Sequence, residues 1–202
     1  MLRMFDEINS TDRISLPYDE YFDEMDLSDE EKEERKELAR EFEILFLFLL
    51  MAYRKAQSEE MKAVLQNKYR DIAMAFIGTD KETSYIAEYS KQIIDEVIRT
   101  TNENINDPYY TSWDRAIYIS ENEANAIGNY RQQMEAVKSG KKYKTWITMN
   151  DKKVRHTHRE IGSLKIPIFE AFQVGDSKMM FPKDSNGEAK EIINCRCVLE
   201  YS

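Results

Sequence analysis

The chain has 202 residues, of which 42% are hydrophobic and 33% charged, with only 4 prolines and 6 glycines, a composition that excludes disordered and collagen-like proteins. The formal net charge of −9 is uneven, because residues 141–202 hold 12 Lys and Arg against 8 Asp and Glu, a charge of +4 that leaves −13 for residues 1–140. This weak positive charge excludes a dedicated DNA-binding domain and allows at most a loose, non-specific contact with nucleic acid.

Residues 1–27 mix aromatic and acidic side chains, and we expect an irregular arm there. The first residues become acidic at once, without a basic start and an apolar core, so we expect no secretory signal. The longest apolar run, residues 44–53, is about half the length that a bilayer span needs. We therefore expect no membrane partner.

The first predicted helix begins after Ser28, where Glu31 occupies the reciprocal position of a capping box, and runs to about Gln57. Residues 42–53 are apolar on nearly every side of this helix, which indicates burial in a core or against another subunit. For the second alternative, an oligomer or partner contact, the candidate binding residues are Phe46, Phe48 and Leu49.

Three more helices follow from apolar residues at helical spacing. They are predicted to run from Ser58 to Gly78, from Thr79 or Thr83 to Thr101, and from Ser112 to about Val137. We interpret their apolar stripes as core, so residues 28–140 are predicted to form one helical domain.

After Gly140 the pattern changes to short β-prone segments at residues 144–148, 164–169 and 192–199, whereas residues 151–160 could form a helical turn. The predicted fold class is therefore α+β, with a long-helix N-terminal part followed by a small C-terminal α+β cap at residues 141–202.

Both histidines and both cysteines of the chain lie in this cap. If residues 151–158 form a helical turn, Asp151, Arg155 and His158 share one face and can form a hydrogen-bonded bracket between loop and strand. We favour this structural cluster over a site with a cofactor.

Two alternatives remain open for the same residues. Cysteines two apart in a strand point to the same side, so Cys195 and Cys197 with His158 could supply three ligands of zinc, with His156, Asp151 or water as the fourth. A nucleophilic Cys–His pair is the other alternative, although no activated-nucleophile signature accompanies it.

The ordered string W-I-T-x-x-D-x-x-V-R-x-x-H-x-x-x-G from Trp146, a Pro182 turn and the final N-C-R-C resemble the C-terminal module of phage Mu F-like minor head proteins, the phage head morphogenesis family. The resemblance covers roughly residues 113–199. Many such modules carry C-x-x-C after the Asp and end in H-x-x-C-R-C, which looks like a zinc site. Here Arg155 and His158 replace the first cysteine pair and Ile192 replaces the histidine, so the resemblance implies a reduced ligand set.

The family's R-A-x-x-I-A-R-T-E-like helix is similar to residues 115–123, and Glu123 falls on its glutamate. Glu123 is expected either to be a solvated helix charge or to pair with Arg155 or Arg196 in the cap. The structural cluster under consideration thus comprises Asp151, Arg155, His158, Glu123 and Arg196.

The resemblance implies a minor head protein that is made in the host cytoplasm and resides in the head interior of the virion. It would bind the portal protein or major capsid protein during procapsid assembly, with the helical residues 28–140 as its partner-docking domain. Its mechanism would be binding rather than turnover, with any contact to packaged DNA weak. The alternative is an enzyme: a zinc-dependent hydrolase or phage-borne toxin that uses His158, Cys195 and Cys197.

Overall fold

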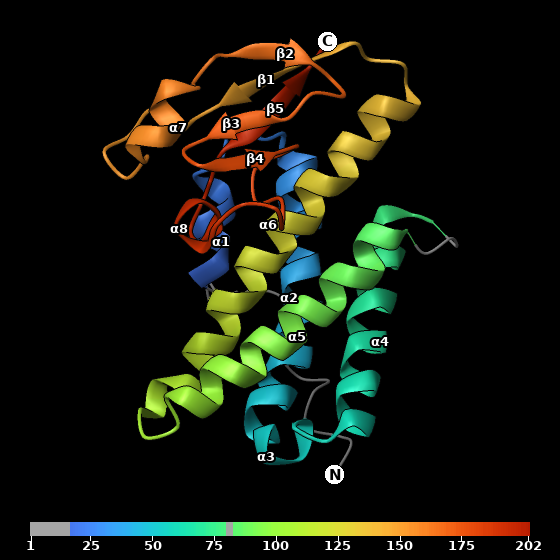
Figure 1. Ribbon diagram of the computed structural model, residues 1–202, viewed down its shortest axis with the longest axis vertical. Coiled ribbons are helices and arrows are strands. Elements are labelled where there is room, and N and C mark those ends of the chain that lie inside the picture. Colours follow the sequence, from blue (N-terminus) through green and yellow to red (C-terminus); the bar gives the residue numbers. More distant parts are fainter. Residues whose placement is uncertain (1–16, 80–82) are drawn as a thin grey trace, which may run out of the picture.

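The computed structural model describes residues 17–79 and 83–202, and it places a helical part beneath a small β-rich cap (Figure 1). The helical part consists of α1 (Pro17–Asp23), α2 (Asp29–Met51), α3 (Tyr53–Ala56), α4 (Glu59–Ile77), α5 (Ser84–Glu103), the 3-10 turn η1 (Pro108–Thr111) and α6 (Trp113–Lys138). The cap consists of β1 (Tyr143–Ile147), α7 (His156–Glu160), β2 (Lys165–Pro167), β3 (Phe172–Val174), β4 (Ser177–Met179), α8 (Ala189–Ile192) and β5 (Val198–Tyr201). The predicted α+β fold class is confirmed.

The four long helices begin at side chains that cap backbone donors. In each case a hydroxyl oxygen accepts a hydrogen bond from the backbone N–H three residues on, at Ser28, Ser58, Thr83 and Ser112. Gly78 ends α4 in the left-handed conformation, with φ of 70°. These starts confirm the predicted ones, and Thr83 rather than Thr79 begins α5.

Helices α2 and α6 form the centre of the helical part, and a glycine allows their close approach. A Cβ at Gly128 of α6 would lie 2.5 Å from Cζ of Arg35 of α2. The fully buried Arg35 guanidinium pairs with Glu31 at 2.9 Å and donates to Asn129 Oδ1 at 3.1 Å. These bonds compensate the buried guanidinium for most of its lost hydration. The guanidinium fills the space beside Gly128, so a side chain at this position would collide with it and disturb the packing of α2 on α6.

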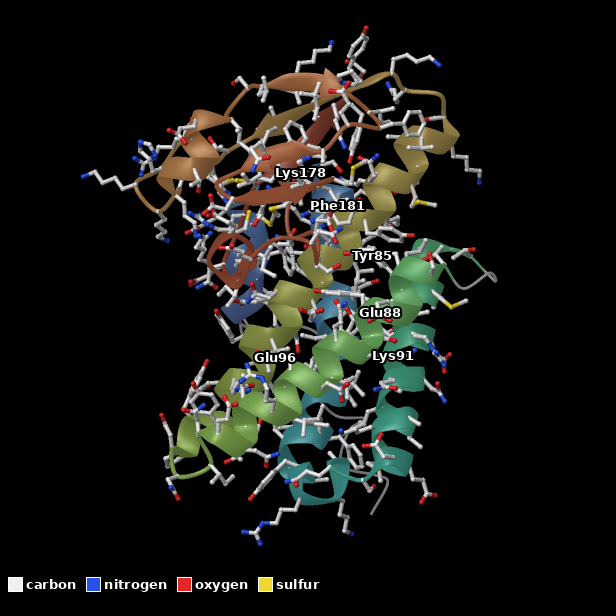
Figure 2. The ribbon with its side chains drawn as sticks, in the orientation of Figure 1. Tyr85, Glu88, Lys91, Glu96, Lys178 and Phe181 are labelled. Atoms are coloured by element: carbon white, nitrogen blue, oxygen red, sulfur yellow. The ribbon has the colours of Figure 1, made fainter. Side chains whose placement is uncertain are left out.

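An aromatic core continues from the helices into the cap. Tyr85 of α5 stacks on Tyr130 of α6 at 4.5 Å between ring centroids, and Phe181 of the cap meets Tyr85 edge-on at 5.7 Å. In Figure 2, Phe181 lies above Tyr85 and to its left, on the cap side of the helices. The helical part and the cap therefore share one hydrophobic cluster, and the division into domains at residues 140 and 141 stays a prediction.

The cap contains a three-stranded antiparallel sheet in the order β2-β1-β5 and a separate hairpin of β3 and β4. Trp146 of β1 pairs with Leu199 of β5 and is fully buried. From α6, Asn125 and Asn129 donate to the carbonyls of Cys195 and Pro182, at 3.0 and 2.9 Å. These two amides fix the cap on the long helix that leads into it (Figure 1).

Several local predictions differ from the structure; for example, the first long helix ends at Met51 and not at about Gln57. Residues 17–23 form α1 rather than part of an irregular arm, because Tyr18 and Phe22 are buried with the helical core; residues 1–16 of the arm lie outside the described residues. The segment 192–199 is not one strand: α8 ends at Ile192 and β5 begins only at Val198. Asn194 between them has a φ of 56°, which no continuous strand accommodates.

The apolar run of α2 is also not buried on every side. Phe46 and Leu49 are fully buried, but Phe48 is 52% exposed, and Ile44 and Met51 are 73% and 76% exposed. The reason is geometric, since α6, α4 and α1 contact the helix and leave one side of it uncovered. Of the candidate partner-binding residues, Phe46 and Leu49 are therefore core, and Phe48 alone is available to a partner.

In the part of the chain that the structure covers, no helix is both long enough and apolar enough to cross a membrane.

Candidate functional site

A buried histidine and two buried thiols meet where α7 packs against the segment that leads into β5. Nδ1 of His158 lies 3.4 Å from Sγ of Cys197 and 3.6 Å from Sγ of Cys195. The ligand atoms of all three residues lie within 4.8 Å of one another. Residues 193–197 form no strand, yet they place both thiols next to His158. Arg196, which lies between the two cysteines in sequence, points outward and donates to Asp151.

The other edge of the His158 ring faces a carboxylate. Nε2 lies 3.2 Å from Oε2 of Glu191 on α8, although the two groups are not aligned for a hydrogen bond. Thr157 Oγ1 donates to the same carboxylate oxygen at 2.8 Å, which orients Glu191. Trp146 contacts the ring of His158 edge-on, with 5.5 Å between centroids. The imidazole is thus held between two thiols, a carboxylate and an indole.

The two thiols are electrostatically unequal. A hydrogen bond from Cys197 lowers the pKa of Cys195 well below its usual range; His158 and the ammonium of Lys183 act in the same direction against the effect of burial. The pKa of Cys197 is raised, first by its interaction with Cys195 and then by burial. One thiol of the pair is therefore predisposed to become a thiolate, the form that binds metals.

The geometry fits a tetrahedral metal ion with three protein ligands. With metal–sulfur and metal–nitrogen bonds of about 2.3 and 2.05 Å, tetrahedral angles require nitrogen–sulfur separations of roughly 3.6 Å. The observed 3.4 and 3.6 Å agree. A cavity of about 10 Å³ borders all three residues, which is about the space of one water molecule. The same small cavity leaves no room for an organic substrate.

Neither side chain that we considered as a fourth ligand joins this site. His156 is 82% exposed and contacts Glu160 at 3.5 Å, and Asp151 accepts from Arg196 at 2.5 Å. The hydrogen bond from Arg196 lowers the pKa of Asp151. Of the three fourth ligands that the sequence suggested, only water remains.

The structure separates the residues that were expected to form a polar bracket. Asp151 pairs with Arg196, Arg155 donates to the Ile193 carbonyl, and His158 faces the thiols. The reason is local: residues 151–154 form turns and α7 begins only at His156, so Asp151 and Arg155 never share a helix face.

Glu123 contacts neither Arg155 nor Arg196 within the described residues, and it is not a solvated charge. It lies on the side of α6 that faces the helical core, where the Tyr69 hydroxyl donates to its Oε2 at 2.8 Å. Burial raises the pKa of Glu123. Glu191 could not be predicted as a site residue, because nothing in its local sequence distinguishes it from a solvated helix charge.

A comparison with known protein families finds a match. The family model of "Phage Mu protein F like protein" matches residues 84–200, which cover α5, α6 and the cap except its last two residues. No curated protein and no solved structure matches the chain. Because the family model spans more than half of the sequence, the chain belongs to the phage Mu protein F like family and is a bacteriophage head morphogenesis protein, a component of the virion that interacts with other head proteins.

Proposed function

We propose that this protein binds the portal protein or the inner capsid surface during procapsid assembly, remains in the head interior, and acts by binding rather than by catalytic turnover. Its family membership supports an association with other head components. The cavity that adjoins the buried histidine–thiol site is only about 10 Å³, so we assign no substrate to that site.

The observation that carries the proposal is an exposed apolar face of α2, made of Ile44, Phe48 and Met51 and here named the α2 stripe. Spacings of four and three residues place the three side chains on one side of the helix. Adjoining exposed apolar side chains on a folded protein mark contact surfaces, whereas scattered ones do not. The stripe lies on the acidic helical part, away from the cap.

The cap carries the opposite charge, +4 over residues 141–202. Lys152, Lys153 and Arg159 extend this charge into solvent near α7. A few dispersed cations neutralise only a few phosphates, so we propose a weak, sequence-independent contact between this side and packaged DNA.

The test is co-expression of the whole chain with the portal protein and the major capsid protein of the same phage, followed by purification of procapsids. Phe48→Asp on the α2 stripe is compared with the control variant Phe169→Asp. Phe169 is also an exposed phenylalanine, 75% exposed, but it lies in the cap. We expect the first variant to stay folded and to be lost from procapsids, and the second to be incorporated like the natural chain.

Incorporation of both variants at the natural level would contradict docking through the α2 stripe. Absence of the natural chain from procapsids that contain portal would contradict the proposed function as a whole. Sedimentation of the purified chain, with and without Phe48→Asp, then shows whether the stripe binds a second copy instead.

A further inference from the structure

The carboxylate of Glu191 is buried, so it is not part of the exposed α2 stripe proposed above for docking. It is 3% exposed, it lies on α8, and its Oε2 is placed 3.2 Å from His158 Nε2 and 2.8 Å from Thr157 Oγ1. Taking a carboxylate out of water is costly unless its charge meets a donor or a cation. The side chain that it faces is the same histidine whose other nitrogen faces two thiols.

We propose that His158 Nδ1, Cys195 and Cys197 hold a zinc-type divalent cation, and that Glu191 is the positioning residue that fixes His158 as a ligand through Nδ1. The site has three protein ligands, and the fourth place is taken by a water or small anion in the adjoining cavity. This inference is independent of the docking proposed for the α2 stripe.

The tautomer of His158 carries the argument. A neutral imidazole has one N–H and one lone pair, and a carboxylate beside Nε2 favours the proton on that nitrogen. Nδ1 then presents its lone pair toward the two sulfurs, at 3.4 and 3.6 Å. A carboxylate behind a metal-binding histidine also raises the basicity of the ligand and restrains the ring.

The surroundings favour a soft divalent cation such as zinc. Two thiolates and one imidazole are ligands that zinc prefers over magnesium or calcium. Two thiolates neutralise a divalent charge, which limits the cost of burying the ion. When bound, the metal would connect α7 to the segment before β5, so its contribution is to the fold of the cap.

The experiment uses the whole chain, reduced and stripped of metal, and titrates it with zinc in competition with a chromophoric chelator. We expect about one zinc per chain, and loss of binding in Cys197→Ser. Cobalt added in place of zinc should give the intense visible bands of a tetrahedral site and the ultraviolet thiolate band.

Glu191→Gln tests the positioning role, with Glu160→Gln as the matched control. Glu160 also contacts a histidine, His156, but both are exposed. We expect Glu191→Gln to weaken zinc binding by about 10-fold or more and Glu160→Gln to leave it unchanged. Circular dichroism on the metal-free variants checks that both are folded.

If Glu191→Gln fails to fold, Thr157→Val takes its place, because it removes the hydrogen bond that orients Glu191 and leaves all three ligands intact. An equal zinc affinity for the Glu191 and Glu160 variants would overturn the positioning role. A natural chain that binds no zinc, or cobalt bands unaffected by Cys197→Ser, would overturn the metal site itself.

Discussion

Two phenylalanines on α2, two positions apart, should respond very differently to the same truncation. Phe46 is fully buried, with its ring centroid 6.1 Å from that of Phe42 and 6.4 Å from that of Tyr69. Phe46→Ala removes these contacts and leaves a cavity, and we expect the free energy of unfolding to fall by about 3–5 kcal/mol. For a protein of ordinary stability, about 5–15 kcal/mol, this is about a fifth or more of the total.

Phe48→Ala should be mild in comparison. Its ring is 52% exposed, so truncation loses about half of the transfer energy of a buried phenylalanine and leaves no enclosed cavity. We expect a loss of about 1 kcal/mol. Because a chain of this size loses roughly 2–4 °C per kcal/mol, the melting temperature should fall by roughly 6–20 °C for Phe46→Ala and by roughly 2–4 °C for Phe48→Ala.

Urea unfolding followed by circular dichroism at 222 nm measures both variants against the natural chain. The slope of the transition should be the same for all three, since the surface exposed on unfolding hardly changes. Equal destabilisation by the two variants, or a larger effect at Phe48, would refute the assignment of Phe46 to the core and of Phe48 to the surface.

Three further predictions follow from particular contacts. Gly128→Ala should lower the free energy of unfolding by about 2–4 kcal/mol in urea titrations, because its Cβ would displace the buried Arg35 guanidinium; a gain in stability, as at an exposed helix glycine, would contradict this. Burial lowers the pKa of Lys144 to about 8, against 10.5 in the unfolded chain. The unfolded state therefore binds more protons between these values, so the urea midpoint should rise from pH 8 to 9.5. Lys144→Met should reduce this rise without abolishing it, because burial also lowers the pKa of Lys183 to about 8; an unchanged slope would exclude Lys144 as a source. Fluorescence anisotropy with duplex DNA should show weak binding by the whole chain that falls steeply with salt and is weakened by Lys153→Glu; binding that persists at high salt would contradict a contact made only to phosphates.

The sequence determined the features whose causes lie within a few residues. Ser28, Ser58 and Ser112 mark helix starts because a hydroxyl reaches a backbone donor three residues away, whatever the rest of the chain does. Gly78 ends α4 for an equally local reason, its left-handed backbone. The order of residues from Trp146 to Cys197 likewise indicated the family, which the match over residues 84–200 bears out.

Only the tertiary structure decided which side chains are buried and which residues that are distant in sequence come into contact. Periodicity cannot separate Phe46 from Phe48 in a run that is apolar all round, since only the positions of α4 and α6 settle which side is covered. The site shows the same limit. His158 meets two thiols and Glu191 because α7, α8 and the segment before β5 converge, and residues more than thirty positions apart carry no local signal of that convergence.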